Sequence, residues 1–349
     1  MMPKKDKLEM QDLNGFLEKY VRYLQKDSET EINLSLTGNS GAFLFYCHAI
    51  EVGVEGADSQ YWNKLVVDIF HYITKGNMNE KTSYWNGIYG MILMFEVLDK
   101  SELIDSKICS AFFDFDKILI DKLIQGQIVD DEILYLANTL LIRLRHYQRI
   151  HDLYVGAEIA LVHVVEIILR ANVNLLFPTL LQTNQIAFLT RMVQRGLYVQ
   201  PIIKFMRQLR PKLSLFFESE TPSVESINVM LVYSDYLDRI GDRKALKAMK
   251  RSILSIDYLN ISYSSKLTFE ENLSYFIFLN RLIRFYHVNP LLTLSTFISN
   301  RLMDDRHQML SGQSLPQFRN GILNSSLALT TISFYYPNLS AWDIVLLIS

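Results

Sequence analysis

The sequence predicts an all-α protein made of paired helices, on the strength of three observations. Apolar residues recur at three- and four-residue spacing in one segment after another, which is the period of a helix. Only 14 glycines and 8 prolines interrupt 349 residues, well below the usual share of chain breakers. No segment shows sustained alternation of apolar and polar residues, so strands are not expected.

The composition narrows the class of protein. The chain is 49% hydrophobic and 21% charged, with a formal net charge of −2, so it can bury a large core and has no general attraction for nucleic acid. Two cysteines, Cys47 and Cys109, make no disulfide framework. This favours a reducing compartment, and we expect a cytoplasmic protein. No secretory signal and no apolar run long enough to span a membrane are present in the sequence.

A short glycine-containing phrase recurs before apolar helices. Gly38 can adopt a positive φ, and Asn39 and Ser40 can cap the helix that is expected over 42–51. The phrase occurs at residues 38–41, 85–90, 153–157 and 319–326, with a weaker echo at 183–188. Each occurrence predicts a turn that opens a buried helix, followed by a more polar partner helix.

The remaining helices follow from apolar periodicity. Residues 1–33 are expected to form an N-terminal helix, over 8–26, and a polar link. Thr268 and the Gly241-Asp242 pair mark helix boundaries, and a turn is expected at Leu180–Gln185. Further helices are predicted at 60–75, 104–124, 131–153, 159–169, 198–217, 225–240, 243–256, 268–286 and 290–303.

Pairs of helices joined by short turns favour a closed ring, the α/α toroid. In this fold the inner helices form a barrel and the outer helices surround it. An open solenoid is the alternative. A solenoid needs polar end repeats, whereas the first and last repeats here carry the strongest buried-helix phrases. We therefore expect a single toroidal domain over residues 1–349.

The glycine turns resemble those of the lanthionine synthetase C-like family, the cyclases of lanthipeptide biosynthesis. The closing stretches Gly321–Leu327 and Ser340–Asp343 are also similar to that family, and the resemblance runs from residue 34 to 349. It implies a toroid whose mouth holds zinc through two cysteines and one histidine. The zinc-bound thiolate of a substrate cysteine then adds to a dehydroamino acid.

The zinc ligands implied by this resemblance are not matched in the chain. Ser223 stands at the first cysteine position, and Phe269 and Glu270 stand at the Cys-His pair. Leu181 stands at the catalytic histidine, and only the family's aspartate finds a match, in Asp152. We therefore expect no zinc and no other cofactor.

The binding residues expected at the mouth are Asp152, His151, Ser223, Glu225 and Glu270. Carboxylates gathered there would disfavour a thiolate and suit a cationic or hydroxyl-rich partner. The first hypothesis is a zinc-free, non-catalytic homologue that binds a peptide or a partner enzyme, such as a dehydratase, during maturation of a ribosomal peptide. The alternatives are a zinc-independent cyclase or other transferase using Asp152, His151 and Glu270, and a toroid that binds lipid or that binds or hydrolyses glycans.

Several other reactive or charged residues are expected to be structural. Cys47 and His48 are adjacent on a helix and point about 100° apart, so we expect core packing. Cys109 is expected to be a buried apolar residue, and His146 to lack a partner at ligand spacing.

Charged runs are expected to be solvated helix faces. This interpretation applies to Asp114 and Asp116, to Asp130–Glu132, and to the arginines between Arg143 and Arg149. The basic stripe Arg243–Arg251 is interpreted as ordinary surface, with an acidic leader peptide or partner as the alternative.

Overall fold

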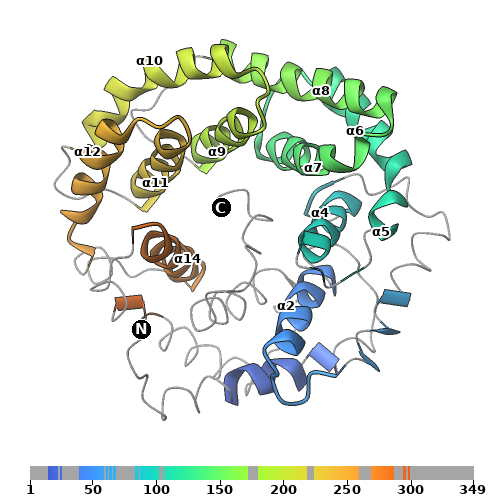
Figure 1. The fold of residues 1–349 in the computed structure, drawn as a ribbon. Coiled ribbons are helices and arrows are strands. Elements are labelled where there is room, and N and C mark those ends of the chain that lie inside the picture. Colours follow the sequence, from blue (N-terminus) through green and yellow to red (C-terminus); the bar gives the residue numbers. More distant parts are fainter. Residues whose placement is uncertain are drawn as a thin grey trace. The chain divides into compact units, whose positions relative to one another are not determined.

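A computed structural model shows the fold, and every element it describes is helical or irregular (Figure 1). The structure describes residues 15–25, 39–67 and 83–104 with single-residue gaps, and then 107–171, 180–217, 224–258, 269–286, 294–295 and 298. No strand occurs in these ranges, which confirms the all-α class. Gly38, Ser223, Thr268 and the phrase at 319–326 lie outside them.

The chain divides into two compact units. The first comprises Met1–Ile104, Thr268–Asn280 and Asn289–Trp342, and the second comprises Asp105–Leu267, Arg281–Val288 and Asp343–Ser349. Helix α14 (Phe269–Tyr286) contributes its first part to the first unit and its end to the second. The single toroidal domain stays a prediction.

In the first unit, α2 (Asn39–Glu51) packs against α4 (Ile88–Lys100). The α2 helix begins at Asn39, three residues before the predicted start, so Gly41 lies in its first turn. The α4 helix is buried on all sides over Ile88–Leu98, as expected for a helix without a polar face. Phe43 of α2 meets Phe95 of α4 with ring centroids 6.2 Å apart.

Cys47 and His48 of α2 are both buried, as expected of core residues. Nδ1 of His48 lies 3.0 Å from Oε2 of Glu51, while its Nε2 has no hydrogen-bond partner in the described part of the chain. Burial lowers the pKa of His48, and the contact with Glu51 offsets only part of this effect. A charged His48 would leave a buried N–H without an acceptor, which explains why its pKa is lowered.

We therefore expect acid to destabilise the protein through His48. Because its folded pKa lies below the unfolded value of 6.5, its stabilising contribution is fully present above that pH. The contribution is lost as the pH falls toward the folded pKa, by up to about 1.4 kcal/mol per pH unit. Urea unfolding at several pH values between 5 and 8 should show a shallower pH dependence for His48→Asn than for the wild type. Equal slopes would contradict this assignment.

The described part of the second unit contains eight complete helices besides the end of α14. They are α5 (Lys107–Ser110), α6 (Phe113–Gln125), α7 (Asp131–Tyr147), α8 (His151–Arg170), α9 (Leu180–Gln194), α10 (Val199–Phe217), α11 (Val224–Arg239) and α12 (Arg243–Leu254). From α6 onward they alternate between two layers (Figure 1). The buried layer is α7, α9 and α11, and the covering layer is α6, α8, α10 and α12. Neighbours pack within each layer, α7 on α9 and α9 on α11, and α6 on α8 and α8 on α10.

The helices α7 and α9 of the buried layer run parallel to one another, as cross-helix contacts show. Near the start of α9, Asn184 donates to Asp131 at the start of α7, with a distance of 2.9 Å, and Arg191 contacts Asn138 two turns further along both helices. The neighbouring helices α6 and α7 run in opposite directions, because Arg143 near the end of α7 binds Asp116 near the start of α6.

Two expected boundaries in this unit are wrong. The helix predicted over 131–153 ends at Tyr147, and α8 begins at His151 without a glycine, a proline or a side-chain cap. Gly156 does not open a turn; it lies inside α8 against Ile120 of α6. The turn expected at Leu180–Gln185 is likewise the beginning of α9.

Other boundaries follow their sequence signals. The side chain of Asp130 accepts a hydrogen bond from the backbone N–H of Ile133 and caps α7. Asp242 accepts from the N–H of Ala245 and caps α12 directly after Gly241, which has φ +73°. Both carboxylates satisfy backbone donors that a helix start otherwise leaves without partners.

Arg143 and Asp116 form a fully buried ion pair, which corrects their interpretation as solvated residues. Both side chains are 0% exposed. Nε and Nη2 of Arg143 lie 2.8 Å and 2.6 Å from the two carboxylate oxygens, and Nη2 also donates to the Cys109 carbonyl at 3.0 Å. The rings of Phe112 and Tyr147 lie 5.8 Å and 5.9 Å from the guanidinium carbon. Asp114 is exposed and pairs with Lys117, as expected.

Within the ranges that the structure describes, no helix is both long enough and apolar enough to cross a membrane.

Candidate functional site

His151 and Asp152 form the first turn of α8, and both are exposed. A carboxylate at this position interacts favourably with the positive end of the helix dipole, since the first backbone N–H groups lack intrahelical partners. The position therefore fits a helix-stabilising role as well as a binding role, and the binding role stays a prediction.

Glu225 and Glu270 each lie in the first turn of a helix, α11 and α14 respectively. Their backbones are therefore at helix starts, as the sequence predicts. Their side chains, and Ser223 altogether, lie outside the described residues. Leu181, at the position that the resemblance gives to a catalytic histidine, is half-buried in the first turn of α9.

Asp152 and Glu225 lie at the starts of helices in different layers of the second unit. The α8 helix belongs to the covering layer and α11 to the buried layer (Figure 1). The start of α8 follows directly on the end of α7, so Asp152 follows a buried helix rather than opening one. That Asp152 and Glu225 gather at one mouth stays a prediction.

The donor set at the family's zinc positions does not fit zinc. A hydroxyl, a phenyl ring and one carboxylate replace two thiolates and an imidazole at Ser223, Phe269 and Glu270. Structural and catalytic zinc sites need three or four nitrogen, sulfur or carboxylate ligands. One such group at these positions is too few, so no step through zinc is derived.

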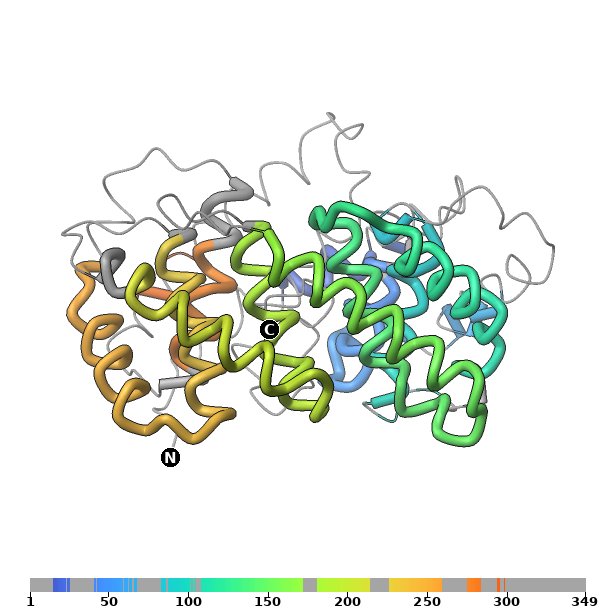
Figure 2. Tube along the Cα trace, turned by 90° about the horizontal axis from the view of Figure 1, so that it is seen from above, coloured from blue at the N-terminus to red at the C-terminus, as the bar shows by residue number. Residues whose placement is uncertain are grey.

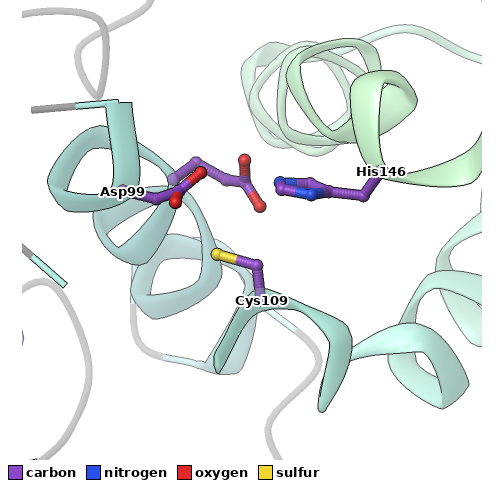
Figure 3. Close-up of side chains that lie close together, drawn as sticks. Asp99, Cys109 and His146 are labelled. Atoms are coloured by element: carbon purple, nitrogen blue, oxygen red, sulfur yellow. The ribbon is translucent and has the colours of Figure 1, made fainter. Parts of the chain in front are cut away.

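The second unit brings together a thiol and an imidazole that no sequence pattern pairs. Cys109 projects from α5 and His146 from α7 into the same space (Figure 3). Their ligand atoms lie within 4.8 Å of each other, with Cys109 buried and His146 half-buried. Burial of Cys109 is as expected, but the expectation that His146 has no partner at ligand spacing is wrong. No spacing rule connects a residue of α5 with one of α7.

Arg145 makes this pair a poor cation site. Its Nε donates to Nε2 of His146 at 3.2 Å, so the lone pair of that nitrogen is already engaged. A metal ion at this nitrogen would have to displace the guanidinium, and one bound elsewhere on the ring would be repelled by its positive charge.

The first unit holds a pair of carboxylates at the end of α4. Glu96 is 1% exposed, and one of its oxygens lies within 4.8 Å of one from Asp99. Asp99 is half-buried and lies in the last turn of the helix (Figure 3). Both residues have further interactions, and two carboxylates alone define no chemistry.

A polar seam between α7 and α9 is the second feature that sequence reasoning missed. We define it as Asp131, Tyr135, Asn138, Asn184 and Arg191. Asn138 and Asn184 are fully buried. The Nδ2 atom of the first and the Oδ1 atom of the second have no hydrogen-bond partner among the residues described here. Burial raises the pKa of Tyr135 well above its ordinary value, so the seam keeps a neutral phenol.

The seam begins where α7 and α9 start. The exposed cap Asp130 and the half-buried Asp131 and Glu132 lie at this end. The expectation that Asp130–Glu132 is only a solvated face is therefore too simple, because Asp131 binds Asn184. An amide with a free donor or acceptor can bind a peptide group or an ordered water.

Comparison with known proteins finds no family model that matches this chain and no curated protein with a similar sequence.

Proposed function

We propose that this chain is a zinc-free α/α toroid of the lanthionine synthetase C-like kind. In this proposal it binds a cytoplasmic peptide, or a partner enzyme such as a dehydratase, during maturation of a ribosomal peptide. The observation that supports it best is the alternation of α6–α12 between two layers (Figure 1), with α7 and α9 parallel in the buried layer. Hairpins of this kind are the building unit expected of such a toroid.

The proposed binding end is the one where the buried helices start. It holds Asp130, Asp131 and Glu132 and the first turn of α11 with Glu225. Glu270 begins α14 in the same manner. Carboxylates at such an end attract cations and raise the pKa of a nearby thiol. This chemistry favours binding a cationic or hydroxyl-rich segment over activating a substrate cysteine.

A single peptide tests binding and catalysis together. The probe is a synthetic, fluorescein-labelled peptide with several lysines, one cysteine and one dehydroalanine. We expect fluorescence anisotropy to report binding that weakens with salt, because exposed charges are screened. Mass spectrometry after alkylation measures how fast the free thiol is lost. We expect this rate to be the same with and without the protein, whether or not zinc is added.

Paired variants locate the binding end. Glu132→Gln with Glu225→Gln should weaken binding by about tenfold through loss of two charges. Asp152→Asn with Glu158→Gln removes the same charge at α8 and should change binding less than threefold. A larger loss of binding in the Asp152→Asn, Glu158→Gln variant than in the other would place the site at α8.

The alternatives give different results with the same probe. Ring closure above background that Asp152→Asn abolishes would establish the zinc-independent enzyme instead. Binding to an oligosaccharide but not to the peptide would establish the glycan-binding alternative and reject the proposal.

A further inference from the structure

The helices α10 and α12 carry cations and no acidic residue. Four lie on α10 and five on α12. All are exposed except Lys250, which is half-buried. We call this surface the basic face, and its residues are Lys204, Arg207, Arg210, Lys212, Arg243, Lys244, Lys247, Lys250 and Arg251.

The two helices form one surface of the covering layer. Figures 1 and 2 both show α10 and α12 side by side (Figure 1, Figure 2). Arg210 of α10 lies 3.3 Å from Asp242, the residue that caps α12. On α12, the buried side chains Ala245, Met249 and Ile253 occupy the opposite side of the helix from the lysines. The cations are therefore gathered on the solvent side by the same amphipathic pattern that packs the helix.

The charge arrangement is unfavourable for the fold itself. Arg243 and Lys244 occupy the first turn of α12, where the helix dipole is positive and carboxylates are preferred. Asp242 offsets part of this repulsion, but it also serves Arg210. A sequence that places two cations against this local rule, with only one shared carboxylate to offset them, indicates a role outside folding.

Neighbouring elements limit what can bind there. The other two covering helices carry exposed Asp114, Asp121 and Asp152 beside exposed Lys117 and Arg170, and the whole chain has a net charge of −2. A long, stiff polyanion such as a nucleic-acid duplex would extend beyond the basic face onto a surface that adds no net attraction. Among the large apolar side chains exposed in the described ranges, only Leu254 belongs to α10 or α12, so the face offers little to insert into a membrane.

We infer that the basic face binds an acidic segment of a protein partner, extended and short enough to stay within α10 and α12. From Arg243 to Arg251 the helix rises about 12 Å, which an extended chain covers in about four residues. A segment of about eight residues rich in Asp and Glu would therefore reach both helices. This inference is independent of the proposed function, because it concerns the covering layer and not the starts of the buried helices.

The test uses the full chain and a fluorescein-labelled twelve-residue peptide of alternating glutamate and glycine. We expect anisotropy to show binding that weakens at least tenfold between 50 and 200 mM salt, roughly as screening predicts for several charge contacts. A peptide of alternating lysine and glycine should not bind this face. Failure of the acidic peptide to bind the wild type would overturn the inference.

Charge variants tie the binding to this face. Lys244→Glu, Lys247→Glu and Arg251→Glu together should weaken binding by about a hundredfold, and the three glutamine replacements by about tenfold. The matched control reverses three exposed cations elsewhere, Lys117→Glu, Arg149→Glu and Arg170→Glu. It should change binding by less than about threefold, although the net charge changes equally.

Further arms of the experiment separate the possible polyanions. Circular dichroism checks that each variant is folded. If the triple glutamate variant unfolds, the triple glutamine variant tests the inference in its place. Equal losses in the α12 set and the control set would show that only net charge matters and would overturn the inference. Tighter binding to a twelve-base-pair DNA duplex, or to vesicles with phosphatidylserine, than to the acidic peptide would also overturn it.

Discussion

Replacing Arg143 with methionine should lower the free energy of unfolding by about 3–5 kcal/mol. The substitution keeps an unbranched side chain of similar length, so packing against Phe112 and Tyr147 is largely retained. It leaves the Asp116 carboxylate 0% exposed with no countercharge. A buried charge that loses its partner keeps its desolvation cost and loses the attraction that compensated for it.

Guanidinium unfolding of the wild type and three variants checks this result. The matched control is Lys117→Met, which removes a cation from an exposed ion pair on α6, the helix of Asp116; its two side chains are 63% and 89% exposed. It should cost less than about 1 kcal/mol, because solvent screens such pairs. The double variant Arg143→Met with Asp116→Leu should recover much of the loss, since no charge then remains buried. Similar costs for Arg143→Met and Lys117→Met would contradict the structural role of the pair.

The ion pair also shows why part of the structure was not predictable. The helix periodicity of α6 and α7 was readable, and the Asp130 cap follows a known rule. Pairing of Asp116 with Arg143 depends on which turn of α6 meets which turn of α7, and no local pattern encodes that register. A charged residue at a buried helical position looks, in sequence, the same as one at the boundary of a polar face.

The same limit applies to the candidate site. The sequence indicates that His151 and Asp152 lie near a helix boundary. Which helix they belong to, and therefore where in the unit they lie, depends on the break at 148–150. That break has no glycine, proline or capping side chain, so nothing in the sequence placed α8 in the covering layer. The Cys109–His146 pair and the polar seam likewise arise from contacts between helices.

The glycines of the recurring phrases differ in how tightly their surroundings are packed. Gly90 is buried in the first turn of α4, among residues that are all buried, and α4 packs on α2. Gly156 lies in α8, and a methyl group added there would approach Ile120 to 3.5 Å, an ordinary contact. The two glycines occur in similar phrases, yet their surroundings predict opposite responses to a larger side chain.

We therefore expect Gly90→Leu to destabilise the protein by about 1–3 kcal/mol or more, because four extra carbon atoms must enter a filled core. Gly156→Ala should be neutral or stabilise by up to about 1 kcal/mol, because alanine favours a helix interior over glycine. Thermal midpoints of both variants, with Gly41→Leu in α2 as a second buried position, provide the measurement. A stable Gly90→Leu would remove close helix packing as the reason for the glycine at the start of α4. The recurring phrases would then lose their physical basis as repeats.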